Sequence, residues 1–203
     1  MSSFWQPVAL SRDLPPLVVM PVSAFGRDIA LWRSAQGRAA AWADRCPHRG
    51  MRLSHGFVRG EALSCIYHGW SYAESGACLR IPAHPDLTPP EAIRVPIFPL
   101  AEVGGLLWVG DPEGSEPTAP PPNPGALEPL RSLTLAAAGI AGLAQRLDGF
   151  WRGRIADVAV TAAANPRPDG GLTLHVLTEA APVAARIQVS RWLDRLRQEA
   201  EAA

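Results

Sequence analysis

The sequence contains few of the residues that mark secreted, membrane-bound or nucleic-acid-binding proteins. Only three of its 203 residues are cysteine, and an odd number does not suit a framework of paired disulfides. Lys and Arg together number 19, as do Asp and Glu, so the formal net charge is zero. That balance gives no indication of a nucleic-acid partner or of an anionic membrane surface.

Long apolar runs are also missing. The longest, residues 133–144, is too short to cross a membrane, and we expect it to be buried or to lie at an interface. The first residues, Met1 to Pro7, lack the basic segment and the apolar run of a signal peptide. We therefore expect a cytoplasmic protein with reduced thiols and no membrane partner.

Histidine is scarce as well, since the chain has only five. Two of them lie close to two of the three cysteines, in the stretches Cys46-Pro47-His48-Arg49-Gly50 and Cys65-Ile66-Tyr67-His68-Gly69-Trp70. Each stretch places a thiol and an imidazole close together, as two loops would that converge on one metal centre.

The other cysteine and histidines give weaker signals. We expect Cys78 to be a small buried side chain on a strand, because free cysteine is among the most buried residues. His55 and His84 are expected in exposed loops, since histidine is seldom fully buried. Arg49 is expected to be either a structural ion-pair partner or part of a docking face.

Two kinds of metal site use thiolate and imidazole ligands. A structural zinc site usually pairs Cys with Cys and His with His at short spacing. Here each stretch carries one of each, which favours a [2Fe–2S] cluster with both thiolates on one iron and both imidazoles on the other. Gly50 and Gly69 would let the backbone approach the inorganic sulfides, and Tyr67 and Trp70 would exclude water. The zinc module stays open as the less favoured alternative.

Short apolar runs bounded by Gly or Pro predict antiparallel β-strands as far as about residue 112. Residues 52–60 are expected to form a loop. The predicted strands are 17–20, 29–32, 39–42, 62–64, 70–72, 93–98 and 106–109.

The composition changes after that region. Residues 116–130 are rich in Pro, which predicts an extended linker. Beyond it we expect strands at 155–164 and 172–178 and a helix that begins near Pro182. One face of this helix, with Ala185, Val189, Trp192 and Leu196, is expected to pack against its own domain, and a contact with another subunit is the alternative.

These elements define a mainly β protein. We expect an antiparallel β-sandwich domain over residues 1–115 and the Pro-rich linker over 116–130. A small α+β tail with a C-terminal helix is expected over 131–203.

The two cysteine–histidine stretches, at their observed separation, resemble the Rieske domain of Rieske non-haem iron oxygenases. The resemblance runs from about Trp5 to Asp111. It implies a Rieske-type [2Fe–2S] cluster in which Cys46 and Cys65 bind one iron and His48 and His68 bind the other.

A second resemblance covers the end of the chain. Residues 157–179 resemble late strands of the catalytic domain of the vanillate O-demethylase type of oxygenase, and the last helix resembles the C-terminal helix of that family. This implies a truncated catalytic domain of the aromatic ring-hydroxylating class.

The ligands of a second iron are not evident. A complete oxygenase of this family holds a mononuclear iron with two His and a carboxylate, yet His175 is the only His after residue 84. Neither Asp148 nor Asp157 is followed by a His at helical spacing. We therefore predict no mononuclear iron site in this chain, and it stays open whether this oxidoreductase component is an enzyme by itself.

The resemblance implies a one-electron-transfer protein of an oxygenase system. The chain has no Gly-rich nucleotide motif, so we expect a separate flavin or ferredoxin reductase as the electron donor and a mononuclear non-haem iron site as the acceptor. The alternative is a non-catalytic or regulatory subunit that assembles with a full-length Rieske oxygenase acting in aromatic ring hydroxylation or O-demethylation.

Overall fold

The computed structural model describes residues 4–111, 113, 120–136 and 150–202, and this part of the chain is mostly β. The chain divides into two compact units. We name residues 13–100 and 109–114 the loop unit, and residues 1–12, 101–108 and 115–203 the tail unit. No helix in the described ranges is long and apolar enough to cross a membrane.

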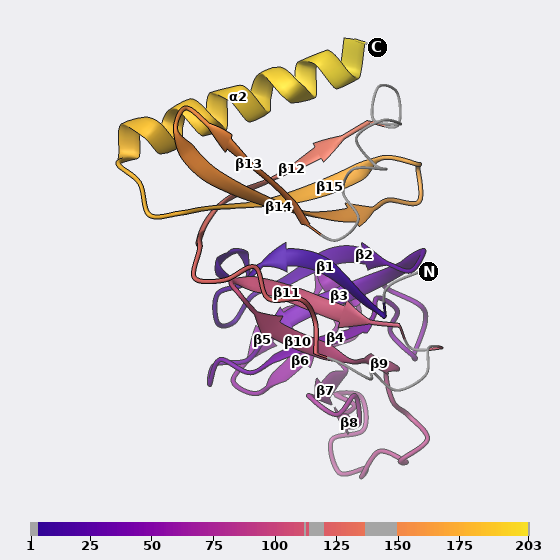
Figure 1. Cartoon of the computed structure of the whole chain (residues 1–203). Helices are drawn as coiled ribbons and strands as arrows, with labels where there is room; N and C mark the ends of the chain where they lie inside the picture. The colour runs from indigo at the N-terminus through magenta and orange to yellow at the C-terminus, as the bar shows by residue number, and fades with distance from the viewer. Residues whose placement is uncertain (1–3, 112, 114–119, 137–149, 203) are drawn as a thin grey trace. The chain divides into compact units, whose positions relative to one another are not determined.

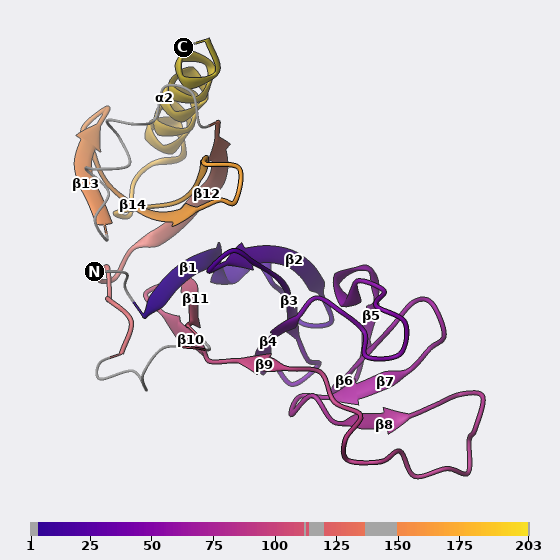
Figure 2. The same cartoon turned by 90° about the vertical axis from the view of Figure 1, so that its right-hand side faces the viewer.

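The loop unit contains two antiparallel four-stranded sheets (Figure 2). The first has the order β2-β3-β4-β9, with β2 at Val19–Ala24, β3 at Arg27–Arg33, β4 at Ala39–Ala43 and β9 at Ile97–Phe98. The second has the order β5-β6-β7-β8, with β5 at Phe57–Arg59, β6 at Ala62–Ser64, β7 at Ser71–Ala73 and β8 at Cys78–Arg80. Strands β4 and β6 lead directly into the two cysteine–histidine stretches.

Three aromatic side chains form the centre of the loop unit. Trp32, Trp42 and Tyr72 are fully buried, and they pack edge to face, with ring centroids 4.9 Å apart for Trp32–Trp42 and 6.3 Å for Trp42–Tyr72. Edge-to-face pairs add about 0.5–1.5 kcal/mol to the gain from burial. The same cluster of buried residues includes Cys46 and Cys65, so this core fixes the start of both stretches.

The tail unit is a sheet covered by a helix. Its strands have the order β12-β15-β14-β13, with β12 at Glu128–Leu135, β13 at Phe150–Ile155, β14 at Val158–Pro166 and β15 at Leu172–Thr178. Helix α2 (Val183–Ala202) lies across one face of this sheet (Figure 1), where Val189 and Leu193 join its buried core. A three-stranded sheet, β1-β11-β10, falls mostly in the same unit, with β1 at Trp5–Leu10, β10 at Leu100–Val103 and β11 at Leu106–Gly110.

The prediction of a mainly β, antiparallel protein with a C-terminal helix is confirmed. The predicted helix face is also found, because Ala185, Val189 and Trp192 contact the sheet core. Part of the apolar run 133–144 lies on β12, and the rest, from 137, falls outside the described residues, as does Asp148. The division into domains at 115 and 130 stays a prediction.

Three predicted elements are wrong in their limits. Residues 52–60 are not all loop, because Leu53–His55 form a short 3-10 helix and β5 pairs with β6 through a tight turn at Gly60. The run 93–98 is reduced to β9, since Pro96 has no N–H for a ladder. The strand expected from 155 begins at Val158, because Ala156 and Asp157 adopt positive φ values of 50° and 62° in a hairpin turn. Such turns usually carry Asn-Gly or Asp-Gly, so this one gave no sequence signal.

Candidate metal centre

The two cysteine–histidine loops have the same backbone pattern. In the first, the Cys46 N–H donates to the Met51 carbonyl at 2.8 Å, and the Gly50 N–H donates to the Cys46 carbonyl at 2.9 Å. In the second, the Cys65 N–H donates to Trp70 at 2.9 Å, and Gly69 donates to Cys65 at 3.0 Å. The loops are therefore equivalent, with each cysteine at the start and each glycine four residues on.

The equivalent glycines close both loops in the same way. Gly50 has φ 72° and Gly69 has φ 69°, a left-handed conformation that other L-residues adopt at a cost of about 1–2 kcal/mol. The space beside them is also small. A Cβ at Gly50 would lie 3.3 Å from Arg45 Nε, and one at Gly69 would lie 3.2 Å from Pro82 Cγ.

The two loop cysteines are buried next to each other. Cys46 is 3% exposed and Cys65 is 2% exposed. Burial, followed by the effect of Cys46, raises the pKa of the Cys65 thiol, whereas the backbone N–H groups of Tyr67 and His68 lower it. Two buried thiols with backbone donors aimed at one of them suit binding as thiolates to a metal, which supplies the missing positive charge.

The buried Tyr72 hydroxyl lies 3.1 Å from Cys46 Sγ. Burial, and then the hydrogen bond to Cys46, raises the pKa of Tyr72, so its hydroxyl stays protonated. A protonated hydroxyl donates to the sulfur, and a hydrogen bond to a thiolate stabilises its negative charge. Nothing in the sequence indicates this role for Tyr72, although it lies only two residues after Trp70.

The two loop histidines contact each other edge to face and are less buried than the cysteines. The His48 and His68 rings have centroids 4.6 Å apart, and His48 stacks on Trp70 at 4.3 Å with an interplanar angle of 5°. Partial burial, then the charges of His68 and Arg49, lowers the pKa of His48. The neutral imidazole, which is the form that binds a metal, is favoured at neutral pH.

Buried Asp44 anchors the segment that follows the first loop. Its carboxylate accepts the Ser54 N–H at 2.7 Å and the Ser54 hydroxyl at 2.6 Å, and Arg52 lies 3.6 Å away. Hydrogen bonds to a buried carboxylate are about twice as strong as neutral ones. This contact, which sequence reasoning also missed, ties the end of β4 to the short helix at Leu53–His55.

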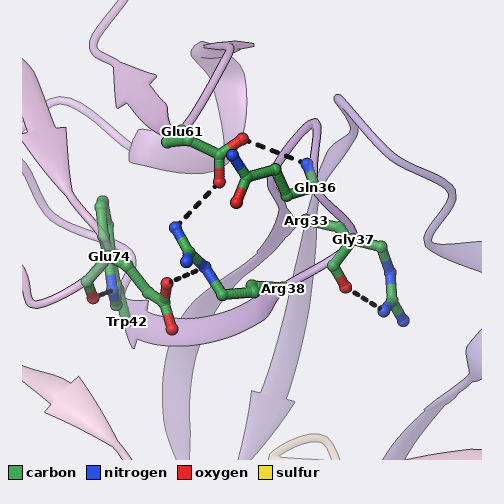
Figure 3. A network of polar contacts seen from close by, with 7 residues as sticks. All are labelled: Arg33, Gln36, Gly37, Arg38, Trp42, Glu61 and Glu74. Carbon is green, nitrogen blue, oxygen red and sulfur yellow. Dashed lines mark hydrogen bonds and ion pairs between the residues drawn. The ribbon is translucent and has the colours of Figure 1, made fainter.

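A polar network joins the first sheet to the second (Figure 3). Arg38 on β4's hairpin pairs with Glu61 at 3.0 Å and with Glu74 at 2.7 Å. The Trp42 indole N–H donates to the Glu74 carbonyl at 3.2 Å, and the Gln36 N–H donates to the Glu61 carboxylate at 3.1 Å. The hairpin before the first loop is thus held against the turns on either side of the second loop.

The other candidate residues have the burial that their weaker signals indicated, although His55 ends the 3-10 helix Leu53–His55 instead of lying in a loop. Cys78 is buried on β8, and His55 and His84 are exposed. His175 lies far along the chain on β15, fully enclosed, with Nδ1 2.9 Å from the Ser132 hydroxyl. It is a structural partner of β12 within the tail unit.

The four loop side chains form two pairs, the two buried thiols and the two imidazoles, whose ring centroids lie 4.6 Å apart. Among the described residues, no three or more His, Cys, Asp or Glu side chains are placed to hold one metal ion. A structural zinc ion needs four ligands that converge on one point, whereas a [2Fe–2S] cluster needs only two for each iron. The paired thiols and the paired imidazoles match the second requirement.

Comparison with known proteins places the loop-bearing part of the chain in one family. Two cysteine–histidine loops on an antiparallel β framework are an arrangement that iron–sulfur domains use. Residues 4–99 match the Rieske [2Fe–2S] domain, a family whose cofactor is a [2Fe–2S] cluster. This confirms the resemblance seen in the two loops.

Related proteins are similar to about half of the chain. Oxidoreductase NdmD of Pseudomonas putida is 44% identical over 113 residues, which cover 54% of this chain and 19% of that protein. Phenoxybenzoate dioxygenase subunit alpha of Ectopseudomonas oleovorans is 41% identical over 113 residues, covering 54% of this chain and 27% of the relative. The chain therefore spans only about a fifth to a quarter of their lengths.

The likeness in fold extends further along the chain. The crystal structure of dicamba monooxygenase bound to dicamba matches with a TM-score of 0.68 at 19% sequence identity, covering 86% of this chain and 75% of that one. This coverage exceeds the part of the chain that the Rieske match includes. The tail unit therefore shares in the similarity of fold.

Proposed function

We propose that this chain is a one-electron carrier of an oxygenase system. It accepts electrons from a separate flavin or ferredoxin reductase and passes them to a mononuclear non-haem iron site. The observation that carries the proposal is the pair of equivalent loops, which bring two buried thiols together and set two imidazoles edge to face.

We assign the four cluster ligands to these loops. Cys46 and Cys65 bind one iron as thiolates, and His48 and His68 bind the other as neutral imidazoles. A bound cluster of this kind supplies a one-electron centre whose potential is higher than that of an all-cysteine cluster, because two negative ligands are replaced by neutral ones. The cytoplasm, where thiols stay reduced, is the location that suits these ligands.

The surrounding residues set the environment of that centre. Tyr72 donates a hydrogen bond to the Cys46 sulfur, and the N–H groups of Tyr67 and His68 act on Cys65. Trp70 covers one face of His48 and limits the access of water. His68 is exposed, so it lies on the side of the centre from which a redox partner can approach.

The mononuclear iron is proposed to lie outside this chain. The histidine that follows the loop unit, His175, is enclosed on β15 and bonded to Ser132, which does not suit an open site for O₂. An alternative function follows, in which the chain is a non-catalytic or regulatory subunit beside a full-length oxygenase. This alternative is supported by the name of one relative, which is the alpha subunit of a dioxygenase.

Metal content and spectroscopy of matched variants test the proposal. We expect about two irons per chain, no stoichiometric zinc, and the EPR signal of a reduced [2Fe–2S] cluster. Cys65→Ala and His68→Ala should lose that signal. Their matched controls, Cys78→Ala and His84→Ala, should retain it, because these residues lie in the same unit outside the loops. Bound zinc would contradict the proposal. Loss of iron from the control variants but not from the loop variants would also contradict it.

A second experiment separates the two functions. In native mass spectrometry with a full-length Rieske oxygenase, a carrier should bind transiently, whereas a subunit should form a stable complex of fixed stoichiometry. Substrate turnover by this chain with only a reductase added would overturn both, because it would require the second iron in this chain.

A further inference from the structure

The tips of the two loops form an exposed surface beside the paired histidines. We name the residues of this surface the cluster tip: Arg45, Pro47, Arg49, Ile66 and Tyr67. All five are exposed, with Ile66 at 59% and Tyr67 at 54%. The Tyr67 ring packs against His68, with centroids 3.9 Å apart. Exposed large apolar side chains beside a functional centre are typical of a docking surface.

The cluster tip also carries unbalanced positive charge. Some arginines of the loop unit pair with carboxylates, such as Arg38 with Glu61 and Arg52 with Asp28. By contrast, neither Arg45 nor Arg49 forms an ion pair with any acidic residue in the described ranges of the chain. The formal charge of the whole chain is zero, so a positive field at the cluster tip comes from nearby charges such as these two arginines and not from the net charge of the chain.

We propose that the cluster tip docks an electron-donor protein through an acidic surface with an apolar centre. The inference rests on the proposed electron-carrier function. Two guanidinium groups without an ion pair complement carboxylates, and Ile66 and Tyr67 provide an exposed apolar area for the same contact. A donor must arrive and leave at each turnover, and electrostatic steering speeds such brief encounters. Contact at Tyr67 places the donor next to His68.

Small redox probes of opposite charge test the local field. The cluster is reduced with one equivalent of dithionite and mixed with ferricyanide, which takes one electron and becomes ferrocyanide. We expect the rate constant to fall as salt is added, because salt screens the attraction. Oxidation by the cation tris(phenanthroline)cobalt(III) should instead become faster with salt. Equal salt dependence for both probes would overturn the inference.

Charge variants test whether the positive field comes from Arg45 and Arg49. The double variant Arg45→Gln/Arg49→Gln should slow oxidation by ferricyanide about fivefold at low salt and remove most of its salt dependence. Arg59→Gln is the matched control, because Arg59 is exposed and sits over the Phe57 ring near the opposite end of the β5–β6 hairpin. The midpoint potential of each variant is measured first, so that any change in driving force is corrected.

An acidic plant-type ferredoxin serves as a protein probe for the donor. Its reduced form should transfer an electron to the oxidised chain at a rate that falls with salt and falls in the double arginine variant. Ile66→Ser/Tyr67→Ser should weaken this transfer without changing its salt dependence. An effect of Arg59→Gln equal to that of the double variant would contradict the docking site. If the EPR signal is normal in every variant but no salt dependence occurs, docking fails and the electron-carrier function stands.

Discussion

His48 lies flat against Trp70, with ring centroids 4.3 Å apart and planes 5° from parallel. Residues from the two loops thus contact each other directly, and the stack fixes the plane of one imidazole. Because Trp70 also packs against the aromatic core of the loop unit, it connects the surface histidine to the buried framework.

Removing the stack between His48 and Trp70 should make the bound cluster less stable. Trp70→Leu keeps an apolar side chain but loses the parallel contact, which is worth about 1 kcal/mol. We expect the cluster absorbance to decay about fivefold faster on mild heating, whereas Trp70→Phe should decay at close to the wild-type rate. Unchanged decay in Trp70→Leu would show that the stack does not hold His48.

The Tyr72 hydroxyl should raise the reduction potential. A hydrogen bond to the Cys46 sulfur is stronger when the cluster carries the added electron. Tyr72→Phe is expected to lower the midpoint potential by about 40 mV, which corresponds to about 1 kcal/mol for one electron. Tyr67→Phe is the control, since the exposed Tyr67 ring lies against His68. Equal potentials for Tyr72→Phe and the wild type in a redox titration would contradict this role.

The left-handed glycines should be needed for cluster assembly. Gly50→Ala and Gly69→Ala each place a Cβ in a strained conformation beside Arg45 or Pro82 and should cost about 1–2 kcal/mol. Gly37→Ala, at φ 85° with open space around it, provides a matched backbone strain away from the loops. All three should lower the melting temperature, but iron content should fall in the loop variants only. Full iron content in both loop variants would mean that the loops tolerate the change.

Buried His175 should make the stability of the tail unit depend on pH. Burial lowers its pKa to about 4, whereas the unfolded chain takes up this proton near the ordinary value of 6.5. The unfolded state therefore binds more protons between these values, and the free energy of unfolding falls as pH falls from about 6.5 to about 4. We expect a loss of about 2–3 kcal/mol in denaturant unfolding over this range.

The variant His175→Gln isolates that effect. Gln keeps a polar partner for Ser132 but does not titrate, so the difference in unfolding free energy between wild type and variant should shrink as pH is lowered. His84→Gln, at an exposed position, should follow the wild-type curve. Parallel curves for His175→Gln and the wild type would show that His175 is not responsible.

The sequence predicted the loop chemistry because the pattern of ligands is local. A thiol and an imidazole within a few residues of a glycine identify each loop, and the strands before them follow from apolar runs. The sequence did not predict that the two loops would have the same backbone hydrogen bonds, because the histidines stand at different spacings from Cys46 and Cys65. The backbone pattern instead places Gly50 and Gly69 at the same position.

Long-range contacts account for what the sequence could not reveal. Tyr72 approaches the Cys46 sulfur only because β7 pairs with β6, and Asp44 holds Ser54 only after the chain turns back. The turn at Ala156 and Asp157 lacks the residues usual for its conformation, so the limits of β13 and β14 depended on sheet pairing. Local propensity does not show which distant strands pair with each other.

The assignment of two histidines to one iron is the central claim, and nitrogen hyperfine spectroscopy tests it most directly. The protein is labelled with ¹⁵N-histidine, reduced by one electron, and measured by pulsed ENDOR. Two coupled histidine nitrogens are expected in the wild type and in His84→Ala. The absence of histidine coupling, or coupling to a single nitrogen in the wild type, would contradict the assignment of His48 and His68.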